Sequence, residues 1–543
     1  MNTDKHRSKN LLLVLGPIKK FLSLSVFICA NLWLIFFSAC TSKPTDMRTL
    51  VPAETLVYLE TDDLAAALQP IVDAKPFTEV AKSKPDFSAL KGVQLAVAVT
   101  GFETTEEKLT DEHSVGRVQP RFVAVADTHA WNFQAVKFAE LKLGSLVAEI
   151  YDSEPTLEKT DKNGGKYFTW TAKDGRKAYA LVIDSLIYFG NDQTAIDKCL
   201  AVKRGESDSI AKTGKVQTAS LETIASGYVS TDGIAQIANL IGLKYASETS
   251  EDSEVQSAIA GILPQLLRNS ITEITWTAIK TEQGIEDKYV ITTKPDIAQV
   301  FNETLAPGGE AESILFAHLT DVPSVTRYDL KDPQTAWRSV LLVFQKQVDP
   351  IAAKIINQLS GVLFEPYGIR NPDMFLSGVD SNILTATIDD EPFVIATMGD
   401  EQKVKKSVDP DLRSDKAPTD EGVTFWRTEG NEIGAAFDKN LVILGSVVGV
   451  GSGFRHGKFS MVTPPKEILE RLVRSKSPIT TIGTDLETAV LILNVLSQRE
   501  RDDTKMNPTF YLTETRFTKS GIDRRTTSDF GLIGSIIAQL ADN

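Results

Sequence analysis

The chain has 543 residues, a net charge of −14 and 42% hydrophobic residues. This length exceeds what one hydrophobic core supports, so we expect more than one domain. The acidic balance excludes proteins that bind nucleic acid through a basic surface. Of the three cysteines only Cys199 lies beyond residue 40, which excludes a fold held together by disulfides.

An apolar stretch near the N-terminus predicts export from the cytoplasm. It runs from Phe21 to Ala39 and follows a segment with five basic residues and one acidic residue, which is the layout of a bacterial export signal. The stretch ends in Phe-Ser-Ala-Cys, which resembles the lipobox of bacterial lipoproteins, although Phe37 stands where that motif usually has Leu. The resemblance implies a signal peptide at residues 1–39 and lipidation, by diacylglycerol and a fatty acid such as palmitate, at Cys40.

An uncleaved signal anchor is the alternative, because the 19 residues from Phe21 to Ala39 approach the roughly 20 that span a bilayer. Both alternatives keep the basic flank inside and place the body outside the cytoplasm. The body after residue 39 has a charge near −18, since the preceding residues carry an excess of four positive charges. Thr41 follows the cysteine instead of Asp, which in lipoproteins favours the outer membrane where one is present and otherwise leaves the plasma membrane.

The body begins, after a polar tether at residues 40–50, with alternating strands and helices. Strands are predicted at 93–102 and 122–126 with an acidic loop between them, and a helix at 130–150. Turn signals then follow at hairpin spacing, which predicts an antiparallel meander. The helix that closes the meander carries Cys199, for which we expect a buried and unreactive thiol.

The second half of the sequence repeats landmarks of the first in the same order. The hairpin at 178–191, AYALVIDSLIYFGN, recurs as IGAAFDKNLVILGS at 433–446, and the turn at Gly284 recurs at Gly521. We therefore predict an α+β fold with two similar halves, each an antiparallel meander sheet with packed helices. The predicted boundaries of the two repeats are 51–305 and 306–543.

A long amphipathic helix, kinked at Pro350, is predicted after Asp332-Pro333. Its apolar side chains recur every three or four residues. Most such stripes belong to a core, and some form the binding face for an apolar ligand or a partner. The candidate face consists of Trp337, Leu341, Phe344, Ile351 and Ile355.

Three segments resemble one bacterial family over nearly the whole body. They are the opening PAETLVYLETDDL, the hairpin AYALVIDSLIYFGNDQTAIDKCL and the closing RFTKSGIDRRTTSDFGL. The sequence resembles the family catalogued as domain of unknown function 3352, whose members are often exported or lipid-anchored. These motifs consist of strand and turn residues, so the resemblance implies an architecture and no substrate, cofactor or catalytic residue.

The sequence contains no complete motif for a metal, a cofactor or a catalytic nucleophile. None of His113, His129, His318 and His456 lies at metal-ligand spacing from another, and HExxH, paired CxxC and GxSxG motifs are absent. The glycine-rich segment at 445–453 departs from GxGxxG, so a flexible strand exit is the simpler interpretation. We predict no metal, no cofactor and no catalytic residue.

These patterns favour a lipoprotein of the cell envelope, the periplasm included, that binds other molecules and is not an enzyme. Its predicted partners are the membrane, through the lipid anchor, and an envelope protein. The alternative is a carrier of lipid or another apolar ligand in a cavity between sheet and helices. A third hypothesis is an enzyme with a dispersed acidic site, which would require two carboxylates with perturbed pKa values in one cleft.

Overall fold

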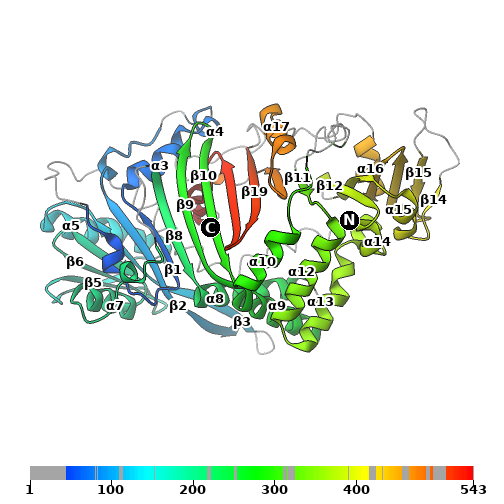
Figure 1. Ribbon diagram of the computed structural model, residues 1–543. Helices are drawn as coiled ribbons and strands as arrows, with labels where there is room; N and C mark the ends of the chain where they lie inside the picture. The colour runs from blue at the N-terminus through cyan, green and yellow to red at the C-terminus, as the bar shows by residue number, and fades with distance from the viewer. Residues whose placement is uncertain are drawn as a thin grey trace.

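A computed structural model gives the structure of the chain (Figure 1). It describes residues 44–79, 81, 84–108, 114–151, 153–216, 222–249, 253–309, 315, 324–388, 391–414, 424–430, 432–454, 464–484, 490–492 and 509–541. No helix within these ranges is both long enough and apolar enough to cross a membrane.

One antiparallel sheet runs through the whole body and contains 20 strands among the described residues. In order of pairing, its first ten strands are β4 (Thr156–Lys162), β5 (Gly165–Thr171), β6 (Lys177–Ile183), β7 (Leu186–Gly190), β3 (Ser114–Asp127), β2 (Gln94–Lys108), β1 (Val57–Thr61), β8 (Thr223–Ser230), β9 (Ile271–Thr281) and β10 (Gly284–Thr293). The predicted α+β class is confirmed, but the sheet is continuous and is not divided between the halves.

The other ten strands continue from β10 in the reverse sense. They are β20 (Gly521–Ser528), β19 (Phe510–Thr518), β18 (Ile479–Thr484), β11 (Ser324–Asp329), β12 (Val379–Ile388), β13 (Glu391–Met398), β17 (Leu441–Ser446), β16 (Ile433–Asp438), β15 (Thr424–Arg427) and β14 (Arg413–Ser414). Counted inward from each end of the sheet, the strands follow the same relative order along the chain. The order β4-β5-β6-β7-β3-β2-β1-β8-β9-β10 corresponds strand by strand to β14-β15-β16-β17-β13-β12-β11-β18-β19-β20.

The β10–β20 pair is the seam between the two sets of strands. Lys288 pairs with Arg525 at its centre, and each strand begins at a turn glycine, Gly284 or Gly521. Both glycines have positive φ, and a Cβ on either would overlap a carbonyl oxygen of the opposite strand. Glycine is therefore required at both positions, because an L side chain has neither the conformation nor the space.

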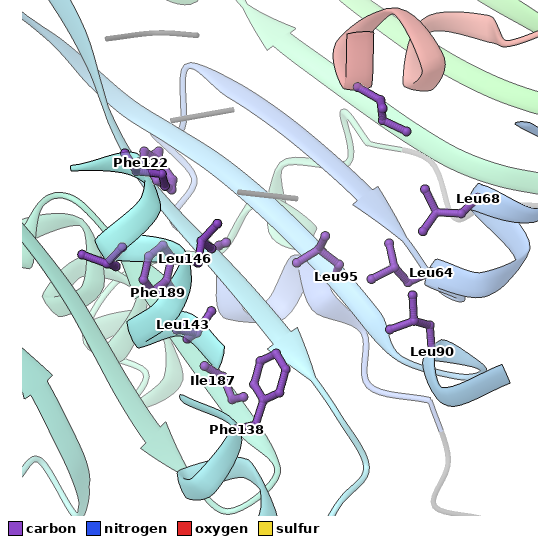
Figure 2. Close-up of a cluster of buried hydrophobic side chains, with 14 of the residues drawn as sticks. Leu64, Leu68, Leu90, Leu95, Phe122, Phe138, Leu143, Leu146, Ile187 and Phe189 are labelled. Carbon is purple, nitrogen blue, oxygen red and sulfur yellow. The ribbon is translucent and has the colours of Figure 1, made fainter. Parts of the chain in front are cut away.

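Helices cover both faces of the first ten strands. One face carries α3 (Leu64–Asp73), α4 (Lys75–Thr78), α5 (Asn132–Phe138), the π-helical turn η3 (Ala139–Leu143) and α6 (Gly144–Ile150). Figure 2 shows the core on this face: Leu64 and Leu68 of α3 lie on one side and Leu146 of α6 on the other, with Leu95 of β2 between them. The opposite face carries η1 (Met47–Leu50), α7 (Gln193–Lys203) and η4 (Ile210–Thr213).

The strands β11–β17 have a similar covering. One core contains residues of α14 (Pro372–Leu376) and α15 (Glu401–Ser407), and the opposite core contains residues of α16 (Val447–Phe454) and α17 (Lys466–Arg474). Two further helices, α8 (Thr231–Thr249) and α9 (Ser253–Ser270), connect β8 to β9. Figure 1 shows α8 and α9 beside the hairpin formed by α12 (Pro333–Gln347) and α13 (Pro350–Val362).

The helix after each seam strand packs on the other half. Helix α10 (Pro295–Thr304) follows β10 and contacts α12, β19 and β20, where Phe301 meets Phe517 edge to face. Helix α19 (Gly531–Ala541) follows β20 and contacts α3 and β10. Each half thus packs a helix with apolar side chains against the other half. The seam is therefore stabilised by this packing as well as by strand pairing.

A buried arginine ties β11 to α17. Arg327 is 1% exposed; its Nε donates to Asn382 Oδ1 at 2.8 Å and its Nη1 donates to the carbonyl oxygens of Leu472 and Ser475. Its Nη2 lies 3.2 Å from Asp329 Oδ2. A cation at the C-terminal end of α17 satisfies carbonyl groups that the helix itself leaves unpaired.

Two predicted segments differ in detail from the structure. The helix expected to kink at Pro350 is two helices, α12 and α13, because Asp349 is extended before the proline and caps α13 through its carboxylate. The acidic loop expected after residue 102 is shorter, since β2 continues to Lys108 and β3 begins at Ser114. The expected helix at 130–150 is present as α5, η3 and α6.

Candidate interaction surfaces

The first described residues bind to the start of β2 and to the end of β3. Thr45 donates from its backbone N–H to Gln94 Oε1 at 2.7 Å and from its hydroxyl to Asp127 Oδ2 at 2.6 Å. Gln94 returns a bond to the Thr45 carbonyl oxygen. Although burial opposes the shift, hydrogen bonds from Thr45 and from the His129 backbone lower the pKa of Asp127. The end of the tether is therefore fixed to the body by charge-assisted bonds.

Two exposed aromatic side chains follow β3 in the chain. Trp131 and Phe133 follow β3 by a few residues, and they are 60% and 69% exposed. The Trp131 N–H is bonded to Gln134 Oε1, which fixes the backbone at the start of α5. Figure 1 shows α5 near one end of the sheet. The sequence analysis missed this pair, although its spacing was a signal, because residues i and i+2 of a helix cannot both face one core.

The structure separates the five residues predicted as an apolar face. Trp337 packs edge to face on Phe364 with ring centroids 5.1 Å apart, and Phe344 packs against the core formed by α10 and α12. Leu341 and Ile355 are half-buried. Ile351 is 75% exposed. The most exposed apolar side chains of this hairpin are instead Leu342, Ile351, Leu359, Val362 and Leu363.

An apolar pocket lies between α3, α19 and the sheet. Its volume is about 110 Å³, and it is lined by residues such as Leu68, Val97, Trp276 and Ile536. Cavities that enclose a small organic molecule usually have about 300 Å³ or more. This pocket therefore has room for a few methyl groups and is too small for a complete acyl chain.

Two buried carboxyl groups have structural partners. Burial raises the pKa of Glu60, which accepts hydrogen bonds from the hydroxyls of Tyr58 and Ser226. Burial also raises the pKa of Asp287 to about 6, and this carboxyl accepts from Trp276 Nε1 and from the Leu532 N–H at the start of α19. Because β10 carries Asp287 and α19 follows β20, this second carboxyl joins the two halves.

Several predicted residues lie outside the described ranges, namely Cys40 and three of the histidines, His113, His318 and His456. His129 is described, with its Nδ1 3.5 Å from Asp127 Oδ1. In the described part of the chain, no three His, Cys, Asp or Glu side chains gather in a way that could hold a metal ion.

Cys199 lies on the buried face of α7, and burial raises the pKa of its thiol to about 12. The expectation of a buried thiol is confirmed. No family model, no curated protein and no solved structure matches the chain.

Proposed function

We propose that the chain is a lipid-anchored protein of the bacterial cell envelope that binds a partner and performs no chemistry of its own. Lipid on Cys40 holds the body on the extracytoplasmic side, and Trp131 and Phe133 rest on the bilayer surface. The observation that carries this proposal is the hydrogen bonding of Thr45 to Asp127, which lies four residues before the exposed Trp131.

The short tether makes the position of Thr45 informative. Five residues span at most about 18 Å, so a lipid on Cys40 keeps Thr45 within that distance of the bilayer. Trp131 lies within about 14 Å of Asp127, the partner of Thr45, because it follows Asp127 by four residues. Tryptophan is favoured at the level of the lipid headgroups, where its ring and its N–H both find suitable surroundings.

The partner face of this proposal lies on the α12–α13 hairpin. Trp337 and Phe344 pack on the protein core, so they are poor candidates for partner contacts. Ile351 and Leu363 are exposed and apolar, which is typical of residues that become buried in an interface. An envelope protein is the proposed occupant of this face.

An internal duplication is part of the same proposal. It is supported by the matching pairing order, by the matching turn glycines Gly284 and Gly521, and by the reciprocal packing of α10 and α19. The hairpins β6–β7 and β16–β17 also have two-residue turns with a positive φ at the same position, Asp184 and Lys439. Two fused copies of one unit account for all of these correspondences.

Lipidation is tested by growing cells that express the full chain or its Cys40→Ala variant with an alkyne analogue of palmitate. We expect label on the wild-type protein and none on the variant, with the variant released from the membrane fraction. Cys199 provides an internal control, because it is buried and is present in both proteins. Equal labelling of the two proteins, or no labelling of either, would contradict the proposal.

The orientation is tested with the full-length protein in vesicles that contain brominated lipids, which quench tryptophan fluorescence at the bilayer surface. We expect quenching in the wild type and much weaker quenching in Trp131→Phe. The other tryptophans, such as the buried Trp170, are the same in both proteins, so the difference in quenching between wild type and variant reports on Trp131. Equal quenching in wild type and variant would show that Trp131 does not touch the bilayer.

A further inference from the structure

A polar pocket opens on the first half of the sheet, between β3, the turn before β6, the end of α6 and the start of α7. Its volume is about 220 Å³, and its lining includes three cationic side chains, Arg121, Arg176 and Lys177, with Tyr151 and Thr194. Acidic residues also line it, so the arrangement of partners decides what the pocket can bind.

The acidic groups leave several donors of the pocket unused. Arg121 has a long ion pair with Glu103 at 3.3 Å, in which both side chains are about half exposed. Asp192, the N-cap of α7, accepts from the Thr194 N–H at 2.9 Å. Lys177 has no ion pair among the described residues. The exposed ion pair of Arg121 with Glu103 contributes little energy, so a ligand can replace Glu103 as the partner of Arg121.

Arg176 is positioned at the pocket by two contacts. Its Nε donates to Asp174 Oδ2 at 2.6 Å, and its guanidinium carbon lies 4.7 Å from the ring centroid of Tyr151. The bond to Asp174 uses Nε, which leaves the terminal nitrogen atoms as donors. A guanidinium fixed in this way loses little conformational freedom when it binds a carboxylate or phosphate.

Tyr151 lines the pocket with a hydroxyl that the fold leaves unpaired. It is 5% exposed, and among the described residues its hydroxyl has no hydrogen-bond partner, which is also true of Tyr167 and Tyr188 outside the pocket. An unpaired buried hydroxyl is unfavourable because it has lost its bonds to water. A ligand oxygen that reached the Tyr151 hydroxyl would remove this cost.

The second half shows that the fold itself does not require these cations. β13 pairs with β17 as β3 pairs with β7, and in that register Glu391 takes the place of Arg121. Counted back from the same two-residue turn, Glu432 takes the place of Lys177. The two positions carry opposite charges in otherwise similar strands, so the positive charge in the first half is a local feature of this pocket.

We propose that this pocket, which at about 220 Å³ is too small to enclose a whole sugar, holds the carboxylate or phosphate group of a small organic anion, such as an acidic or phosphorylated sugar, whose polar body stays at the surface. Arg121, Arg176 and Lys177 bind the charged group, and the Tyr151 hydroxyl donates a hydrogen bond to a ligand oxygen. The first turn of α7 adds the positive end of a helix dipole. This site is independent of the membrane anchor and of the α12–α13 face.

The experiment is calorimetric titration of the full-length protein in detergent micelles with glucuronate, glucose 6-phosphate, inorganic phosphate and uncharged glucose. We expect saturable binding of at least one organic anion and none of glucose. A preference between glucuronate and glucose 6-phosphate identifies the charged group. Binding of inorganic phosphate alone, or no saturable binding, would overturn the proposal.

Three variants locate the site. Lys177→Gln is expected to weaken binding about tenfold, and Lys346→Gln, an exposed lysine on α12, is expected to leave it unchanged. Tyr151→Phe is expected to weaken binding several-fold without lowering the melting temperature of the ligand-free protein. Equal weakening by both lysine variants would show diffuse charge attraction, and unchanged binding in Tyr151→Phe would exclude the tyrosine from the site.

Discussion

Replacing Arg327 by methionine removes the buried cation between β11 and α17. Methionine is long enough to fill much of the same space, so the change tests polar contacts more than volume. The substitution leaves Asp329 buried without its cation and Asn382 Oδ1 without its donor. The carbonyl oxygens of Leu472 and Ser475 lose the bonds that close the end of α17.

The expected loss in the free energy of unfolding is about 3 to 5 kcal/mol, the usual cost of removing one partner from a buried ion pair. Asp329 also accepts from the backbone N–H groups of Gly308 and Gly309, which keeps the loss from being larger. The assay is urea unfolding followed by far-ultraviolet circular dichroism on the full chain in detergent.

The matched control is Arg338→Met on α12. Arg338 also has an ion pair, with Asp373, but the two side chains are 60% and 45% exposed. An exposed pair contributes little to stability, so the control should shift the urea midpoint little. Equal small shifts in the two variants would refute the reasoning, because burial would then make no difference to the value of the arginine.

Three further outcomes are expected. Asp287 titrates at a higher pKa in the folded chain, about 6, than in the unfolded chain, so the free energy of unfolding falls by roughly 3 kcal/mol in total as the pH rises from about 3 to about 7. Asp287→Asn should remove this part of the pH dependence, which urea midpoints across that range measure. Gly284→Ala and Gly521→Ala should each lower the free energy of unfolding by about 2 kcal/mol or more, and with it the melting temperature, because of positive φ and overlap with the opposite strand. Gly261→Ala in α9, where a Cβ meets nothing within 4 Å, should raise it slightly. Iodoacetamide should modify Cys199 only on unfolding, as peptide mass spectrometry would show, and rapid modification of the native protein would contradict its burial.

Local patterns explain which parts of the fold could be predicted from the sequence. The strands β5, β6 and β7 are joined by short turns, and a turn depends on its own residues, such as Asp174-Gly175 and Asp184-Ser185. Strand β4 was not predicted, because it has charged side chains on both faces and gives no alternating pattern. Pairing with β5 decides its conformation, and that information is not local.

The candidate surfaces follow the same distinction. The lipidation of Cys40 is a prediction from adjacent residues, since a signal peptide is recognised as a linear segment. The anion pocket combines Arg121, Tyr151 and Lys177, which the sheet brings together from distant positions. The predicted apolar face combines partly buried residues of α12, such as Trp337 and Phe344, with the exposed Ile351 of α13, because a periodic stripe does not show which of its members face the core.

The two outer strands of the sheet bear on how neighbouring molecules meet. An open edge offers unpaired N–H and C=O groups to any other strand, and such edges promote aggregation. In the described residues, β4 pairs only with β5 and β14 only with β15. β4 carries Glu158, Lys159, Asp161 and Lys162, and β14 has two residues, so neither offers a long apolar template. We expect neighbouring molecules to remain separate even at high concentration, because neither edge offers a long apolar strand for another sheet to pair with.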